Sequence, residues 1–113
     1  MITPSYNEFR QRVGEGTVIP VVKTLLADTE TPVSAYLKIR GRSTYSFLLE
    51  SVGGGEKVAR YSFLGADPFL VFRARGKSGT VRDLNTGMER RFNGDPVGEL
   101  RRLMATYKSV GFP

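Results

Sequence analysis

The sequence predicts an α+β fold, with an antiparallel β-sheet made of a hairpin and a meander and about three short flanking helices. Two helix signals come first along the chain, several strand-like segments follow, and a third helix signal comes near the end. Strands grouped apart from helices are typical of antiparallel α+β domains, whereas alternating βαβ units build parallel sheets. The 113 residues are the size of one domain, and we expect a single domain over 1–113.

Three segments carry start signals of helices. Ser5 and Glu8 have the spacing of a capping box, in which each side chain bonds an amide at the helix start. Thr31-Pro32 and Asp95-Pro96 each place a capping side chain before a proline at the first helical position. The expected helices run from about Ser5 to Val13, from Pro32 to Arg40 before Gly41, and from Asp95 to Tyr107.

The strand signals lie mainly between the second and third helices. Thr44–Val52 and Lys57–Leu64 flank Gly53-Gly54-Gly55, which predicts a hairpin. Three further segments predict a meander, with Asn85-Thr86-Gly87 as its last turn. They are Phe69–Arg75, Gly79–Leu84 and Met88–Phe92. Before these, Thr17–Thr24 contains Pro20 and is expected to be an edge strand or an extended connector.

The composition excludes much catalytic chemistry. The chain has no cysteine and no histidine, so disulfides, thiol nucleophiles, Ser-His-Asp triads and the usual zinc or haem ligands are absent. Any metal site in this chain would need carboxylates, and their spacing does not bring two of them into one pocket. We therefore expect no catalytic residue, no metal and no cofactor in these 113 residues.

The net charge of +6 makes nucleic acid the first partner to test. The 17 basic residues are scattered among 11 acidic ones, and no aromatic-basic signature of an RNA-binding domain is present. A solvated surface therefore explains the charge better than nucleic-acid binding does. A small basic nucleic-acid-binding module is kept as an alternative from a different class.

No apolar run approaches the roughly 20 residues that cross a bilayer. The start of the sequence also lacks the apolar region of a signal peptide. We expect a soluble, cytoplasmic protein with no membrane partner.

One polar segment at a predicted strand end can carry a ligand. In an alternating strand, Leu49 and Ser51 share one face, and Leu48 and Glu50 share the other. The structural explanation is a strand that leaves the core, with Glu50 in water and Ser51 bonded to the turn. The residue pattern by itself favours that structural explanation.

Several runs in fixed order resemble the opening of anthranilate synthase component I, a chorismate-utilising enzyme family. They are Ile2–Ser5, Ile19–Val21, Leu26–Lys38, Tyr45–Val52 and Arg60–Pro68. The resemblance covers most of the chain, and the segment Lys77–Phe92 is its least distinctive part. A related possibility is aminodeoxychorismate synthase component I, whose N-terminal half is similar; the runs Thr31–Lys38 and Leu48–Val52 together favour anthranilate synthase.

The resemblance implies an allosteric tryptophan site. In that family the Leu-Leu-Glu-Ser segment belongs to the feedback pocket, so Glu50 and Ser51 would contact the charged end of the amino acid and Leu49 would line the pocket. Arg60 would lie near the ligand on the returning strand. Pro32 would belong to the surroundings of the pocket, although a helix-start role explains it fully.

The resemblance also implies properties of a larger enzyme that makes anthranilate and pyruvate from chorismate and ammonia. Its expected partners are a C-terminal chorismate-binding domain, which needs Mg²⁺, and a glutamine amidotransferase subunit. In that enzyme this chain would form part of a larger α/β sandwich. Alone it would be catalytically silent, would bind L-tryptophan weakly through half a pocket, and would expose apolar surface that favours self-association.

Overall fold

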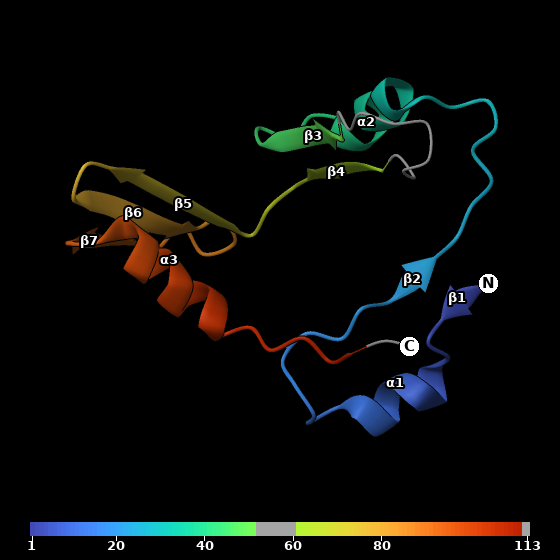
Figure 1. The fold of residues 1–113 in the computed structure, drawn as a ribbon, viewed down its shortest axis with the longest axis horizontal. Coiled ribbons are helices and arrows are strands. Elements are labelled where there is room, and N and C mark those ends of the chain that lie inside the picture. Colours follow the sequence, from blue (N-terminus) through green and yellow to red (C-terminus); the bar gives the residue numbers. More distant parts are fainter. Residues whose placement is uncertain (52–60, 112–113) are drawn as a thin grey trace. The chain divides into compact units, whose positions relative to one another are not determined.

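The computed structural model describes residues 1–51 and 61–111, and it confirms the α+β class (Figure 1). The sheets are antiparallel, with two, two and three strands. The chain forms two compact units, which are described one at a time. The first comprises Met1–Leu26, Phe72–Arg82 and Glu89–Pro113, and the second comprises Ala27–Val71 and Asp83–Met88.

The first unit begins with a short strand and a capped helix. β1 (Ile2–Thr3) pairs with β2 (Val22–Lys23), which is the paired part of the predicted extended segment. Between them lies α1 (Tyr6–Arg12), whose capping box joins Ser5 and Glu8 as predicted. The Ser5 hydroxyl and the Ser5 amide each donate to the Glu8 carboxylate over 2.8 Å, and these two hydrogen bonds lower the pKa of Glu8.

A three-stranded meander is the main sheet of this unit. β5 (Leu70–Arg75) begins in the second unit and continues here, followed by β6 (Ser78–Asp83) and β7 (Glu89–Asn93) in the order β5-β6-β7. The predicted turn between β6 and β7 is present. Its carboxylate oxygen Asp83 Oδ1 accepts from the amides of Asn85 and Thr86, and Gly87 adopts a left-handed φ of 75°.

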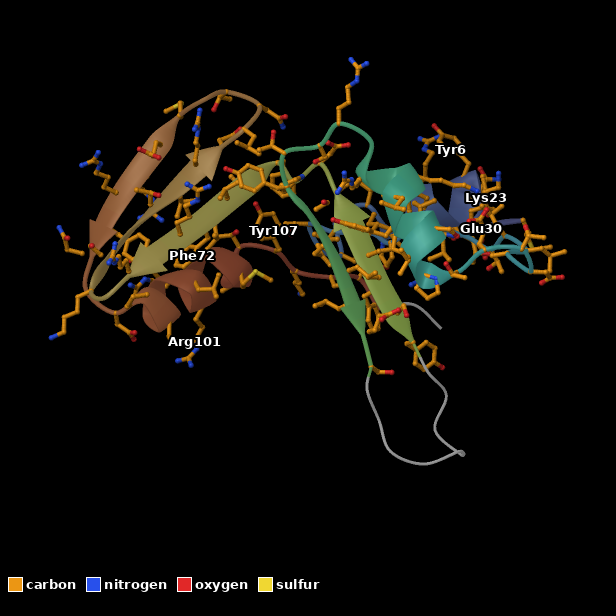
Figure 2. The ribbon with its side chains drawn as sticks, turned by 90° about the horizontal axis from the view of Figure 1, so that it is seen from above. Tyr6, Lys23, Glu30, Phe72, Arg101 and Tyr107 are labelled. Atoms are coloured by element: carbon orange, nitrogen blue, oxygen red, sulfur yellow. The ribbon has the colours of Figure 1, made fainter. Side chains whose placement is uncertain are left out.

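Helix α3 (Pro96–Ala105) lies along one face of the meander (Figure 1). The rings of Phe72 and Phe92 stack with centroids 5.3 Å apart, and Phe72 lies on the α3 side of the sheet (Figure 2). Glu99 links α3 to the meander, because it forms an ion pair with Arg90 on β7 over 3.5 Å. It also forms an ion pair with Arg102 within α3. These contacts define the face of the meander that carries the core.

Two segments far apart in sequence also meet in this unit. The hydroxyl of Thr17 accepts from the Lys108 amide over 2.8 Å and donates to the Thr106 carbonyl over 3.3 Å. Next to it, the Val110 amide donates to Val18 O, and Val110 is buried. This contact, which we call the Thr17 clamp, joins the segment between α1 and β2 to the segment that follows α3.

The second unit packs one helix on one hairpin. α2 (Pro32–Arg40) contacts both β3 (Ser46–Glu50) and β4 (Ser62–Ala66), which pair antiparallel. Thr31 caps the helix and forms a capping box with Ser34, and Gly41 follows its last residue. Glu30 accepts hydrogen bonds from Lys38 and Ser34, and together they lower its pKa.

Several predicted boundaries need correction. β4 continues to Ala66, two residues beyond the predicted end, and α3 stops at Ala105, where Thr106 provides the cap. The predicted turn Gly53–Gly55 and the first part of the returning strand lie outside the described residues. No helix in the described part of the chain is long and apolar enough to cross a bilayer.

Candidate functional site

The predicted ligand segment is the end of β3. Glu50 is the last residue of the strand and lies opposite Ser62. One residue further, the Ser51 amide donates to Tyr61 O over 3.2 Å, and the Tyr61 amide donates to Ser51 Oγ over 3.4 Å. The pairing therefore continues beyond the strand and holds the backbone of Glu50 and Ser51 in place.

The hairpin has two different faces. One face carries Ser46, Leu48 and Glu50, and α2 covers it; the hydroxyls of Tyr36 and Ser46 are 2.7 Å apart. This hydrogen bond lowers the pKa of Tyr36. Leu48 is half-buried beneath the helix. The predicted alternation is therefore present, and Glu50 points to the face on which α2 lies.

The opposite face is apolar and open; we call it the open face. Its large side chains are exposed by about half or more: Phe47 49%, Leu49 61%, Tyr61 63% and Phe63 62%. Leu49 lies directly opposite Phe63, and Phe47 lies opposite Gly65. Ser51 shares this face at the end of the strand. Leu49 and Ser51 thus stand beside an uncovered apolar surface.

Because Glu50 and Ser51 are consecutive, their side chains project to opposite faces of the hairpin. A ligand that contacts both side chains must therefore lie at the end of the hairpin. Both residues are exposed there, and Glu50 has no ion pair with another described residue. A carboxylate at this position can pair with an ammonium, and the Ser51 hydroxyl can donate to a carboxylate.

Pro32 occupies the first turn of α2, immediately after the Thr31 cap. Its exposed ring starts the helix that covers the Glu50 face, so it belongs to the same unit as the strand end. The structure gives Pro32 the helix-start role that its sequence context predicts. The remaining predicted site residue, Arg60, lies outside the described residues.

Sequence reasoning missed a hollow at the other end of the same hairpin. It has a volume of about 280 Å³ and is lined mainly by apolar atoms of Tyr45, Ser46, Phe47, Gly65, Ala66 and Pro68. Gly65 is the signal that could have indicated it. A glycine inside a strand marks a close approach, and here a β-carbon would lie 2.6 Å from the Phe47 ring.

Metal binding has no candidate among the described residues. No group of three or more Asp or Glu side chains gathers there in a way that could hold an ion. The expected Mg²⁺ concerns the C-terminal domain of a longer protein and stays a prediction.

Comparison with curated proteins points to one class, a subunit of a biosynthetic synthase. A protein of Synechocystis sp. is 42% identical over the whole chain, and one of Acetivibrio thermocellus is 37% identical over the whole chain. A Mycobacterium bovis protein is 45% identical over 92% of the chain. No family model and no solved structure matches.

Each of these relatives is anthranilate synthase component 1, so the predicted family resemblance is confirmed over the entire chain. The chain spans 22% of the length of the Synechocystis and Acetivibrio proteins, and it matches their N-terminal part. The activity, substrates and partners of a whole synthase are therefore matters of proposal for this chain.

Proposed function

We propose that this chain is the N-terminal regulatory segment of anthranilate synthase component I and that the end of its β3–β4 hairpin binds L-tryptophan. The observation that carries the proposal is the Leu49-Glu50-Ser51 strand end, where an exposed apolar side chain, a carboxylate and a hydroxyl follow one another along the chain. An amino acid with an apolar ring needs this combination. The resemblance to the synthase over the whole chain supports the same assignment.

In this proposal each residue has a separate role. Glu50 pairs with the ligand's ammonium, and Ser51 donates its hydroxyl hydrogen to the ligand's carboxylate. The Ser51 oxygen already accepts from the Tyr61 amide, which orients the hydroxyl. Leu49 contacts the indole from the open face. The family resemblance assigns Arg60 to the surroundings of the ligand, and Pro32 sets the start of the helix behind the strand.

In this proposal, feedback inhibition arises because tryptophan binds one arrangement of the enzyme's domains more tightly than another. The open face needs a cover, and in a longer synthase the C-terminal chorismate-binding domain provides it, completing the sandwich and the second half of the pocket. Tryptophan at the strand end then favours one arrangement of this segment against that domain. The two ligand sites are coupled by a free energy of about 1–3 kcal/mol, which is typical of allosteric proteins.

The chemistry belongs to the rest of such an enzyme. The C-terminal domain binds chorismate and Mg²⁺, and a glutamine amidotransferase subunit supplies ammonia. We therefore expect the 113-residue chain to form no anthranilate from chorismate and ammonium, with or without the amidotransferase. Fluorescence detection of anthranilate tests this expectation, and turnover above a protein-free control contradicts it.

The binding experiment is calorimetric titration of L-tryptophan into this chain and into the complete product of its gene. We expect weak or undetectable heat with the chain alone and clear binding with the complete product. Glu50→Gln removes the partner of the ammonium, and Ser51→Ala removes the hydroxyl donor. Each substitution should weaken binding by roughly tenfold or more, as expected for a charge-assisted hydrogen bond.

Two matched substitutions serve as controls. Glu89→Gln changes an exposed glutamate on β7, and Ser78→Ala removes a hydroxyl on β6; both lie in the first unit. Neither should change tryptophan affinity. If the complete product binds tryptophan equally well with and without Glu50 and Ser51, the strand end is not the site. If the complete product makes aminodeoxychorismate and not anthranilate, the related folate enzyme is the correct assignment.

A further inference from the structure

The meander has a strongly basic face opposite α3. The stacked Phe72 and Phe92, together with Arg90 bound to Glu99, place the even-numbered residues of β5 and β7 on the α3 side. Side chains alternate along strands, so the odd-numbered residues of β5 and β7 point to the other side. Gly79 pairs with Phe92, so the odd-numbered residues of β6 lie on the α3 side. The even-numbered residues of β6 therefore lie on the side away from α3.

Four arginines occupy this face: Arg73 and Arg75 on β5, Arg82 on β6 and Arg91 on β7. All four are exposed. One acidic side chain of these strands, Glu89, lies on the same face, directly opposite Arg82. Arg75, Arg82 and Arg91 have no ion pair with another described residue. We call this surface the arginine face.

The arginine face carries an excess of positive charge when nothing is bound to it. Like charges on neighbouring strands repel, and arginines two residues apart on one strand lie roughly 7 Å apart. A partner surface that carries carboxylates removes this repulsion on contact. The basic side chains of these strands are all arginines, and arginine is the residue whose planar guanidinium binds carboxylates with two parallel hydrogen bonds.

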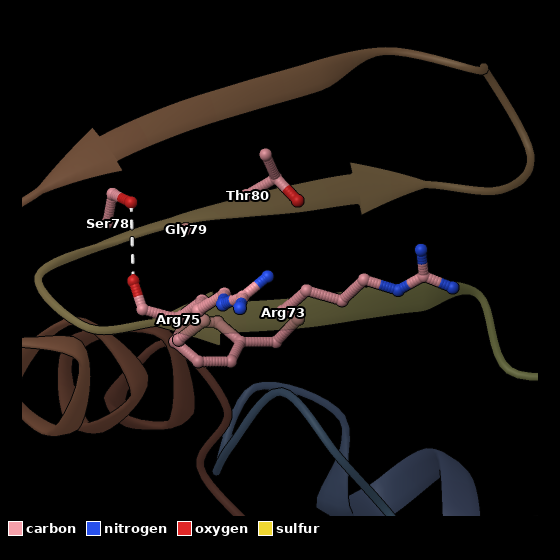
Figure 3. Close-up of a pocket in the computed structure, with 7 residues that line it drawn as sticks. Arg73, Arg75, Ser78, Gly79 and Thr80 are labelled. Carbon is pink, nitrogen blue, oxygen red and sulfur yellow. Dashed lines mark hydrogen bonds between the residues drawn. The ribbon is translucent and has the colours of Figure 1, made fainter.

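A shallow hollow lies along the first two strands of the meander. Its volume is about 560 Å³, and Arg73, Arg75, Ser78 and Thr80 contribute to its lining. Figure 3 shows these side chains on the two strands, with the hydrogen bond from Ser78 Oγ to Arg75 O. Guanidinium and hydroxyl groups thus form part of the lining of this recess, and Phe72, Ala74 and Gly79 form the rest.

We propose that the arginine face is a docking surface for an acidic protein, whose Asp and Glu side chains bind Arg73, Arg75, Arg82 and Arg91. Nucleic acid fits this face less well. Base recognition on single strands uses aromatic platforms, and the arginine face of β5, β6 and β7 carries no aromatic side chain. This surface belongs to the first unit and the tryptophan segment belongs to the second, so the inference does not depend on tryptophan binding.

The test uses a fluorescein-labelled decaglutamate peptide as the probe and measures its fluorescence anisotropy with the 113-residue chain. We expect salt-dependent binding. The double variant Arg75→Gln with Arg91→Gln should weaken binding roughly five- to tenfold, since exposed charge pairs contribute modestly. Circular dichroism confirms that each variant keeps its fold.

The control double variant carries Arg42→Gln and Arg101→Gln. It loses the same charge from exposed sites outside the arginine face, and Arg101 lies on the side of α3 away from the sheet (Figure 2). It should weaken binding by less than about twofold, as expected of screened charges outside the binding surface. Equal losses in both double variants overturn the proposal, because net charge alone then explains binding. No binding of decaglutamate, or tighter binding of a ten-nucleotide thymidine strand at the same salt concentration, also overturns it.

Discussion

Gly79 lies beneath the aromatic ring of Phe92, its partner across β6 and β7, and a β-carbon at Gly79 would overlap both that ring and Arg73 O. Phe92 is among the most buried apolar residues described, with 6% of its surface exposed. The ring therefore cannot turn into solvent without emptying the core. Glycine at this position allows Phe72 and Phe92 to stack under the sheet.

We predict that Gly79→Ala destabilises the first unit by about 1–3 kcal/mol, the usual cost of overpacking a core. Urea denaturation followed by circular dichroism measures the change. Gly65→Ala is the matched control: its β-carbon would also meet a ring, that of Phe47, but Phe47 is 49% exposed and can swing into water. Equal destabilisation by both substitutions contradicts the role given to burial of Phe92.

The open face leads to a prediction about association. We expect the 113-residue chain to self-associate reversibly, because Phe47, Leu49 and Phe63 expose contiguous apolar surface. Phe63→Ser removes the central ring and should raise the dimer dissociation constant roughly tenfold or more, since burying a phenylalanine contributes about 1.5–3 kcal/mol.

Sedimentation equilibrium measures that constant. Met88→Ser is the control, because Met88 is 73% exposed but lies outside the hairpin. It should leave association unchanged. A chain that stays monomeric at every accessible concentration shows that the open face does not drive self-association.

The helix starts could be predicted because their causes are local. Ser5 with Glu8, Thr31 with Pro32, and Asp95 with Pro96 are neighbours in sequence, and each satisfies amides within one turn. The end of the third helix is predicted at Tyr107, whereas α3 ends at Ala105. The apolar stripe continues past Ala105, but Thr106 already bonds back to Leu103 O and ends the helix there.

The long-range contacts could not be predicted in this way. The Thr17 clamp joins residues that are 91 positions apart, and no local pattern marks Lys108 as its partner. Similarly, alternation placed Leu49 and Ser51 on one face of the hairpin, but only the contact of Tyr36 with Ser46 decides which face α2 covers. The ligand role of Glu50 and Ser51 came from family resemblance, since a strand end alone does not specify a ligand.

Glu99 leads to a prediction about pH. Its hydrogen bond from Arg102, with a further contribution from Arg90, holds the pKa of the Glu99 carboxyl below its usual value. A carboxylate with a lowered folded-state pKa stabilises the fold fully above the unfolded-state pKa. That contribution is lost as the pH falls through the lowered pKa. The contact between α3 and β7 should therefore weaken in acid.

Urea denaturation across the acidic range measures this effect. Glu99→Gln should be less stable than the parent chain at neutral pH, and the difference should shrink as the pH falls. Glu89→Gln is the control. Glu89 lies on the face of β7 away from α3, so this substitution changes the same chemical group without removing the ion pair between Glu99 and Arg90. A stability difference for Glu99→Gln that stays constant down to low pH contradicts the assignment.

The Thr17 clamp leads to a prediction about the ends of the first unit. Thr17→Val keeps the shape of the side chain but removes the oxygen that accepts from the Lys108 amide and donates to Thr106 O. We expect a loss of about 1 kcal/mol of unfolding free energy, the usual net value of such a bond. Faster amide hydrogen exchange at Lys108 and Val110 should accompany it, because these amides donate to the Thr17 hydroxyl and to Val18 O. Thr24→Val, an exposed threonine just after β2, should change neither quantity. Unchanged exchange at Lys108 in Thr17→Val would show that the backbone pairing of Val18 with the later segment is sufficient without the hydroxyl.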